Sequence, residues 1–103
     1  MNIVAITSCP AGLAHTPMAA KALEQAGVKM GHTIKVEQQG AMGTINAIEE
    51  KEIKAADFVL IASDQHVSGM ERFEGKKIIR VKIGITLKKP EAVIEKCIEA
   101  IAK

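Results

Sequence analysis

Two nearly continuous apolar runs stand out in the pattern of hydrophobic and polar positions, one over residues 2–7 and one over residues 57–62. Runs of strand length without polar alternation are typical of strands covered on both faces in a parallel sheet. Residues 33–37 alternate between polar and apolar side chains, which favours a strand at an edge, and residues 77–82 predict a further strand. The pattern therefore predicts four strands, of which the first and third along the chain are central.

The segments between these strands have the apolar spacing of helices. We expect helices over residues 17–30 and 44–55, one helical turn near residues 70–73, and a final helix that opens at residues 89–91, with Gly31 as the C-cap of the first helix. The residues expected to form the buried helix stripes are Met18, Ala22, Leu23 and Ala26, then Ile45, Ile48 and Ile53, and finally Val93, Ile94, Cys97, Ile98 and Ile101.

This alternation of strands and helices predicts one α/β domain over residues 1–103. Right-handed crossovers would give a four-stranded parallel sheet with strand order 2-1-3-4 and helices on both faces, a Rossmann-like architecture. Ligands of such sheets bind beyond the carboxyl ends of the strands, where the strand order reverses. That point falls between the first and third strands, so the loops over residues 8–16 and 63–70 are expected to form the site.

Composition narrows the range of functions. The chain has 14 basic and 12 acidic residues, no Trp, no Tyr and two Phe, which argues against nucleic-acid binding. Its apolar runs are too short for a signal peptide or a membrane span, so we expect a cytoplasmic protein. The two cysteines, Cys9 and Cys97, lack metal-ligand spacing, and the Gly-x-Gly-x-x-Gly nucleotide motif is absent. We therefore expect neither a metal nor a cofactor.

Cys9 lies in the segment that joins the first strand to the first helix, where Thr16 is a suitable N-cap and Pro17 suits the first helical position. The N–H groups and partial positive charge of a helix N-terminus stabilise a thiolate, and they can lower the pKa of a cysteine from about 8.5 to roughly 3.5–7.5. The same N–H groups bind phosphate. The loop therefore combines a nucleophile with a phosphoryl-binding cradle, whereas Cys97, on an apolar helix stripe, is expected in the core.

The run Cys9-Pro10-Ala11-Gly12-Leu13-Ala14-His15-Thr16 resembles the active-site signature of fructose-family enzyme IIB, a component of the bacterial phosphoenolpyruvate-dependent sugar phosphotransferase system. The resemblance continues in Val36-Glu37-Gln38-Gln39-Gly40, in Gly43 with Asn46, in Ala56-Asp57, and in Glu71-Arg72-Phe73 with Gly75-Lys76. It implies a transferase in which Cys9 accepts a phosphoryl group from a phosphohistidine of enzyme IIA. Cys9 would then donate that group to fructose or a similar sugar carried by the membrane enzyme IIC.

The other candidate residues each have two interpretations. The backbone N–H groups of residues 11–16 would bind the phosphoryl oxygens, and His15 either donates a hydrogen bond to them or braces the loop. Asp64 is either an acid in a phosphatase or a turn residue, and Arg72 either contacts phosphate or an acidic partner or makes a surface ion pair. Partners are expected to dock transiently on residues 10–16, 38–43 and 64–70, over less than about 1,200 Å².

Two other functions would use the same anion cradle. A small cysteine-dependent phosphatase, or an enzyme similar to an arsenate reductase, would also use Cys9 as its nucleophile. Such phosphatases place an arginine six residues after the cysteine, and this chain has His15 there, which offers one contact where arginine offers a bidentate fork. A non-enzymatic module that senses a phosphorylated ligand is the third possibility. Only the relay requires both a donor protein and an acceptor.

Overall fold

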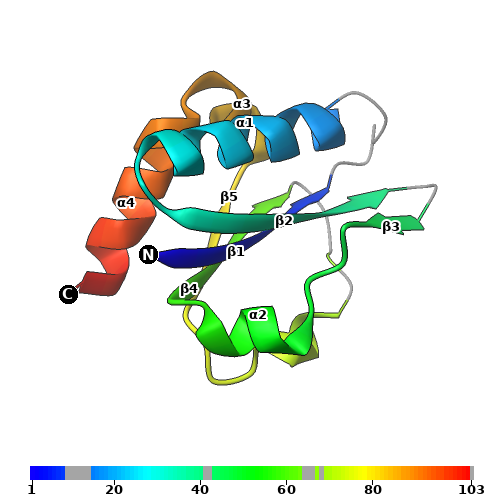
Figure 1. The fold of residues 1–103 in the computed structure, drawn as a ribbon. Helices are drawn as coiled ribbons and strands as arrows, with labels where there is room; N and C mark the ends of the chain where they lie inside the picture. The colour runs from blue at the N-terminus through cyan, green and yellow to red at the C-terminus, as the bar shows by residue number, and fades with distance from the viewer. Residues whose placement is uncertain (9–14, 41–42, 64–66, 68, 103) are drawn as a thin grey trace.

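A computed structural model describes residues 1–8, 15–40, 43–63, 67 and 69–102 (Figure 1). Its strands are β1 (Asn2–Ser8), β2 (Thr33–Gly40), β3 (Gly43–Ile45), β4 (Phe58–Ser63) and β5 (Ile78–Val81). Its helices are α1 (His15–Lys29), α2 (Glu50–Ala55), the 3₁₀ turn η1 (Met70–Phe73), α3 (Ile83–Lys88) and α4 (Pro90–Ala102).

The strands form one five-stranded sheet in the order β3-β2-β1-β4-β5. Its four parallel strands lie in the order predicted from the sequence, but the sheet as a whole is mixed, because β3 pairs antiparallel with β2. The prediction of a purely parallel four-stranded sheet was therefore wrong at one edge. Instead of ending in a loop after residue 37, β2 continues to Gly40, which pairs with Gly43 across a short connection.

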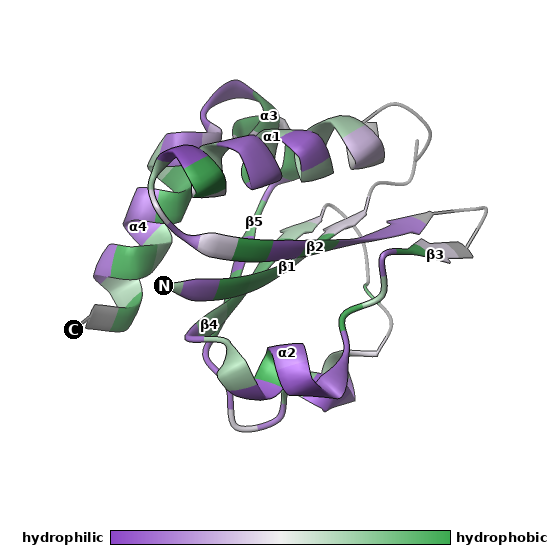
Figure 2. Cartoon of the chain, in the orientation of Figure 1, coloured by the Kyte–Doolittle hydropathy of each residue, from purple (hydrophilic) through white to green (hydrophobic). Residues whose placement is uncertain are grey.

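Two apolar layers enclose the sheet, with α1, α3 and α4 on one face and α2 and η1 on the other (Figure 1). The central strands supply both layers, because successive side chains of a strand point to opposite faces. In β1, Ile3 and Ala5 belong to the cluster beneath α1 and α4, whereas Val4 and Ile6 belong to the cluster above α2. Colouring by hydropathy shows apolar residues along these strands and polar residues on the outer sides of the helices (Figure 2).

Helix α1 differs from the prediction at its start and in its buried stripe. It begins at His15 rather than at Pro17, so Thr16 lies inside the helix and is not its N-cap. Pro17 is the third helical residue, a first-turn position where its missing N–H is not needed. Met18 is 58% exposed, while the buried residues are Ala19, Ala20, Leu23 and Ala26. The sheet-facing stripe is thus rotated away from Met18.

The segment after β2 shows the largest difference. Residues 43–45 form β3, and α2 begins only at Glu50, where Glu49 and Glu52 form a capping box. Ile48 and Ile53 are buried as predicted, but Ile45 is 55% exposed. The sequence suggested a longer helix because these isoleucines have helical spacing, although Ile45 belongs to an edge strand. Helix α3, which buries Ile83 and Thr86, was not predicted.

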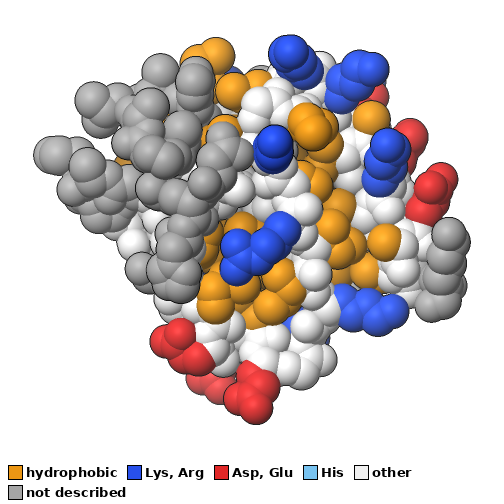
Figure 3. Space-filling model, turned by 180° about the vertical axis from the view of Figure 1, so that it is seen from behind, with side chains coloured by type: hydrophobic (Ala, Val, Ile, Leu, Met, Phe, Trp, Pro, Cys, Tyr) orange, Lys and Arg blue, Asp and Glu red, His pale blue; other side chains and the backbone are white. Residues whose placement is uncertain are grey.

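Strand β5 forms the edge of the sheet opposite β3, and none of its residues is fully buried. Ile78 is 40% exposed, and Lys77, Arg80 and Lys82 surround it along the chain. The view from behind shows apolar side chains at the surface among lysine and arginine side chains (Figure 3). Charged residues along an edge strand disfavour its pairing with a second chain.

Gly31 ends α1 as predicted, in a Schellman motif. Its φ is +83°, its N–H donates to the carbonyl of Val28 over 3.0 Å, and the N–H of His32 donates to the carbonyl of Gly27 over 2.8 Å. Only glycine adopts this left-handed conformation without steric cost.

We expect Gly31→Ala to lower the free energy of unfolding by about 1 kcal/mol, because a Cβ at Gly31 meets no neighbour and only the left-handed backbone is penalised. Gly84→Ala is the matched control. Gly84 also has open space around it but lies within α3, so alanine there should raise the free energy of unfolding by about 0.5–1 kcal/mol. Urea denaturation measures both changes, and equal signs would contradict this explanation.

Candidate functional site at the carboxyl edge of the sheet

Three polar residues lie side by side where the parallel strands end. Ser8 of β1 is in register with Gln39 of β2 on one side and with Ser63 of β4 on the other. Ser8 is 1% exposed, and all three residues belong to the sheet face that α2 covers, by the alternation of each strand. The first turn of α1 lies at the same end of the sheet (Figure 1). In the sequence, Cys9 directly follows Ser8, and Asp64 directly follows Ser63.

Most of the predicted site residues lie outside the described part of the structure. These are Cys9, Pro10, Ala11, Gly12, Leu13 and Ala14 in the first loop, together with Asp64 after β4. His15 and Thr16 form the first two residues of α1. The roles suggested for all of these residues stay predictions. The described strands β1 and β4 nevertheless end side by side, as the predicted switch point between the first and third parallel strands requires.

Arg72 is the accessory residue that the structure describes in full. Its guanidinium binds the carboxylate of Glu37 through two hydrogen bonds, from Nη1 to Oε1 over 2.9 Å and from Nη2 to Oε2 over 3.0 Å. Its Nε donates to the carbonyl oxygen of Gly69 over 2.8 Å, and its Cζ lies 4.9 Å from the centre of the Phe73 ring. The pair is not the surface ion pair considered from the sequence, because the side chain of Glu37 is only 1% exposed.

The carboxylate of Glu37 has further donors. The N–H of Ile48 donates to Oε1 over 2.9 Å, and Nε2 of Gln39 donates to Oε2 over 2.7 Å. Burial alone would raise the pKa of Glu37, but the hydrogen bonds from Arg72, Gln39 and Ile48 outweigh burial and lower that pKa below its ordinary value. Glu37 is therefore ionised at neutral pH, and its partner holds the pKa of Arg72 above the ordinary value of arginine.

Sequence analysis missed the burial of Glu37. The alternation of residues 33–37 suggested that the polar side chains of this strand face solvent, as expected at an edge. Because β3 extends the sheet, β2 is not an edge strand, and the face that carries Glu37 is covered near its carboxyl end. The sequence did contain a signal for the pairing of Glu37 with Arg72. The two residues have opposite charges, and both belong to segments that carry the family resemblance.

Other residues of that resemblance support the fold at the opposite end of the sheet. The backbone N–H of Asn2 donates to Oδ2 of Asp57 over 2.8 Å, which joins the starts of β1 and β4. Nζ of Lys76 donates to the carbonyl oxygens of Lys54 and Ala56, over 3.1 and 2.9 Å, and so satisfies the C-terminal end of α2. These residues have a structural explanation that needs no ligand.

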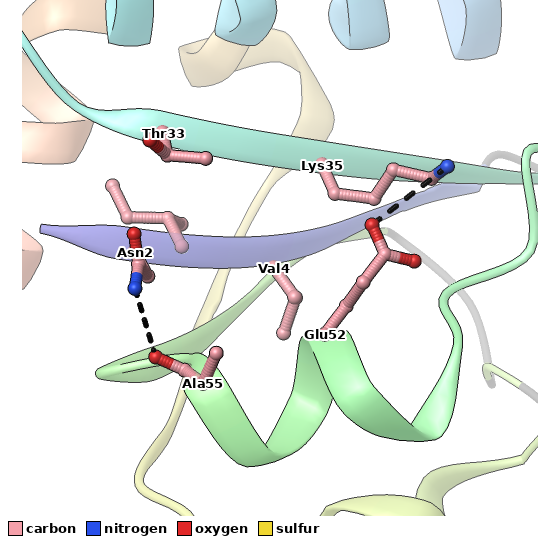
Figure 4. Close-up of a pocket in the computed structure, with 7 residues that line it drawn as sticks. Asn2, Val4, Thr33, Lys35, Glu52 and Ala55 are labelled. Atoms are coloured by element: carbon pink, nitrogen blue, oxygen red, sulfur yellow. Dashed lines mark hydrogen bonds and ion pairs between the residues drawn. The ribbon is translucent and has the colours of Figure 1, made fainter.

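A cavity of about 190 Å³ lies between β1, β2 and α2, also near the amino ends of the strands (Figure 4). Lys35 and Glu52 form an ion pair of 3.8 Å beside it, and Nδ2 of Asn2 donates to the carbonyl oxygen of Ala55 over 3.2 Å. Its lining is mostly apolar. The cavity lies at the end of the sheet opposite Ser8, so it is separate from the candidate site.

Cys97 lies in the core as predicted, with 2% of its surface exposed. Burial raises the pKa of its thiol to about 11, so it has little thiolate at neutral pH. Among the described residues, no three His, Cys, Asp or Glu side chains come together in a metal-binding group. No helix within the described part of the chain has the length and apolarity needed to cross a membrane.

Comparison with known proteins identifies the family. The family model described as the lactose/cellobiose-specific IIB subunit of the PTS, the sugar phosphotransferase system, matches residues 4–96. The chain is 54% identical over 88 residues to a fructose-specific EIIB'BC component of Vibrio cholerae, covering 85% of this chain and 15% of that protein. It is 46% identical over 99 residues to a fructose-specific EIIB component of Haloferax volcanii, covering 96% of this chain and 62% of that protein.

A solved structure agrees with these relatives. The solution structure of the enzyme IIB subunit of a PTS from Escherichia coli K12 matches with a TM-score of 0.90 and 35% identity, over 98% of this chain and 94% of that one. The chain spans less than two thirds of the length of either curated relative. The resemblance found in the sequence is confirmed, although the matching family model has another sugar in its description. This chain belongs to the IIB family of the phosphotransferase system, among relatives of the fructose type.

Proposed function

We propose that this protein relays a phosphoryl group during sugar uptake, with Cys9 as the residue that carries it. A phosphohistidine of an enzyme IIA is the donor, and the acceptor is a hydroxyl group of fructose or a similar sugar held by a membrane enzyme IIC. The observation that carries the proposal is the match to fructose-type EIIB proteins, at 54% identity over 88 residues. Cys9 follows directly after Ser8, the last residue of the central strand β1.

The chemistry consists of two displacements at phosphorus. The thiolate of Cys9 attacks the phosphorus of the phosphohistidine, so that the S–P bond forms as the N–P bond breaks. A sugar hydroxyl oxygen then attacks the same phosphorus, loses its proton, and releases the thiolate. Both steps need a site that orients the phosphoryl group and stabilises charge on its equatorial oxygens. Backbone N–H groups of residues 11–16, the last two of which begin α1, are suited to this task.

Intact-mass measurement tests the proposal. The protein is incubated with phosphoenolpyruvate, the general phosphotransferase proteins and a fructose-type enzyme IIA. We expect a gain of one phosphoryl group that depends on enzyme IIA. Peptide mapping should place this group on Cys9. If several enzyme IIA proteins give no gain while the protein releases phosphate from an aryl phosphate, the phosphatase replaces the relay.

Docking of the donor is expected to use Met18. This residue is 58% exposed in the first turn of α1, three residues after the helix begins. We expect Met18→Gln to raise the KM for phosphorylated enzyme IIA about fivefold, the effect of losing about 1 kcal/mol of apolar contact. The kcat should remain unchanged, because the side chain takes no part in the chemistry.

Val28→Gln is the matched control for this measurement. Val28 is 73% exposed on the same helix, ten positions further along, which is about 15 Å away. Its replacement should leave the KM within twofold of the parent value. Equal KM values for the two variants would show that the first turn of α1 is not part of the docking surface.

A further inference from the structure

We propose that the ion pair between the buried Glu37 and the half-buried Arg72 is a positioning device for phosphoryl transfer, which holds the strand end beside Ser8 in the geometry that the reaction needs. This inference rests on the proposed function and adds two residues to it. Neither residue is proposed to touch the phosphoryl group. The pair acts through the backbone and side chains that it connects.

The pair joins three separate segments of the chain. Glu37 belongs to β2, Ile48 to the connection between β3 and α2, and Arg72 to η1. The two oxygens of Glu37 together accept four hydrogen bonds of 2.7–3.0 Å from Arg72, Gln39 and Ile48. A planar guanidinium bound through two parallel hydrogen bonds fixes angle as well as distance, which a lysine does not. The three segments are therefore fixed relative to one another.

The connection continues to the row of residues next to Cys9. Gln39 donates to Glu37 through Nε2 and is the register partner of Ser8, which in turn is paired with Ser63. On the other side of the pair, Nε of Arg72 donates to the carbonyl oxygen of Gly69, near the end of the segment that joins β4 to η1. One ion pair thus contacts Gln39 of β2, which is in register with Ser8, and Gly69, which comes directly before η1 in the sequence.

A second ion pair on the same strand, between Lys35 and Glu52, serves for comparison because it lies far from the candidate site. Lys35 lies on the same face of β2, two residues before Glu37, and its Nζ is 3.8 Å from Glu52. Those side chains are 38% and 26% exposed, and the pair lies near the far end of the sheet, beside the cavity of Figure 4. Buried ion pairs add little to stability compared with apolar residues. In the pair at the site end of β2, the carboxylate of Glu37 is buried and accepts four hydrogen bonds, while the Arg72 side chain is 28% exposed. This pair is therefore better explained by the geometry that it imposes.

The test compares Arg72→Lys with Lys35→Met and with Ile53→Val, a core variant that controls for modest loss of stability. Single-turnover transfer from a phosphorylated enzyme IIA gives the maximal rate and the half-saturating concentration. Misplacement of reacting groups by about 1 Å lowers rates by about a hundredfold. We expect Arg72→Lys to lower the maximal rate about tenfold or more, with half-saturation within twofold. Lys35→Met and Ile53→Val should leave both values within twofold.

A second measurement does not depend on the donor. Alkylation of Cys9 by iodoacetamide is followed across pH in the same folded variants, with the modified residue located by peptide mass. We expect Arg72→Lys to slow alkylation at pH 7 at least threefold, because a displaced strand end moves the thiol that follows Ser8, and the two control variants to match the parent. Glu37→Gln should show the same effect as Arg72→Lys.

The outcomes separate this inference from the proposed function. If the parent protein accepts no phosphoryl group but Arg72→Lys still changes the alkylation profile, the relay fails, whereas the coupling of the pair to the position of Cys9 stands. If folded Arg72→Lys transfers and alkylates as the parent does, the pair is only structural and the inference is wrong. If Ile53→Val loses as much rate as Arg72→Lys, the effect belongs to stability and the inference is also wrong.

Discussion

Replacing Cys9 by alanine is expected to abolish phosphoryl acceptance, with a loss of at least about 10³-fold in transfer rate. No other group can form the covalent intermediate that we propose, so the loss should be complete in an intact-mass measurement. Cys9→Ser tests the chemistry more finely. Its hydroxyl is a far weaker nucleophile at neutral pH than a thiolate, so acceptance should be slow although serine is nearly the same size as cysteine.

Cys97→Ala is the matched control, because Cys97 is the second of the two cysteines in the chain. Its thiol is buried in the core, with a pKa raised to about 11. Its replacement should leave the transfer rate within twofold and lower the free energy of unfolding by about 1 kcal/mol, through a small cavity. A phosphoryl group found on the Cys9→Ala protein would disprove the assignment of the nucleophile.

Arg72→Met is expected to lower the free energy of unfolding by about 3–5 kcal/mol, a large part of the 5–15 kcal/mol that is typical for a domain. The reason is that the carboxylate of Glu37 stays buried when its partner Arg72 is replaced. Glu37 is 1% exposed and would keep its hydrogen bonds from Gln39 and Ile48 while losing its only cationic partner among the described residues. Urea denaturation measures the change, with Lys35→Met expected to stay within about 0.5 kcal/mol because its ion pair is partly exposed.

Two further measurements test this explanation. The double variant Glu37→Gln/Arg72→Met removes the buried charge and should recover part of the lost stability. The dependence on pH should differ as well. In the parent protein the pKa of Glu37 is lowered from 4.5, so its contribution is present above about pH 4.5 and is lost as pH falls through the folded-state value.

In Arg72→Met the pH dependence of stability is expected to be reversed, because burial without a cation raises the pKa of Glu37. Lowering the pH then protonates Glu37 and removes its buried charge. The difference in stability between parent and variant should therefore begin to shrink above pH 4.5, as pH falls through the raised pKa of Glu37 in the variant. It should shrink further below about pH 4.5, where the parent loses the contribution of Glu37. A difference that stays constant from pH 7 to pH 3 would show that the ionised carboxylate of Glu37 is not the cause of the loss.

The central part of the fold could be predicted from the sequence because β1 and β4 each contain a nearly continuous apolar run. β1 and β4 are buried on both faces, and continuous apolar runs of this length are typical of such strands. β3 could not be predicted in this way. Its three residues carry one large apolar side chain, Ile45, whose spacing to Ile48 is that of a helix face and not of a strand. Pairing with β2, a tertiary interaction, decides between these two structures.

The candidate site was predictable in position but not in detail. Its place followed from topology, since parallel strands end at one edge and the order reverses between β1 and β4. The start of α1 was displaced by two residues because Thr16 and Pro17 are favourable in more than one position of a first turn. The partnership of Glu37 and Arg72 was not predictable from local pattern, because it joins residues 35 positions apart.

Both chain ends lie at the end of the sheet opposite Ser8 (Figure 1). The N-terminal amino group of Met1 contacts Nδ1 of His32 over 2.9 Å at the start of β2, and Nζ of Lys77 donates to the carbonyl oxygen of Ile101 in α4 over 3.4 Å. Additional domains could therefore be joined at either end without covering the carboxyl edge. This architecture suits a module that serves in multidomain proteins, such as the Vibrio cholerae relative of which it spans 15%.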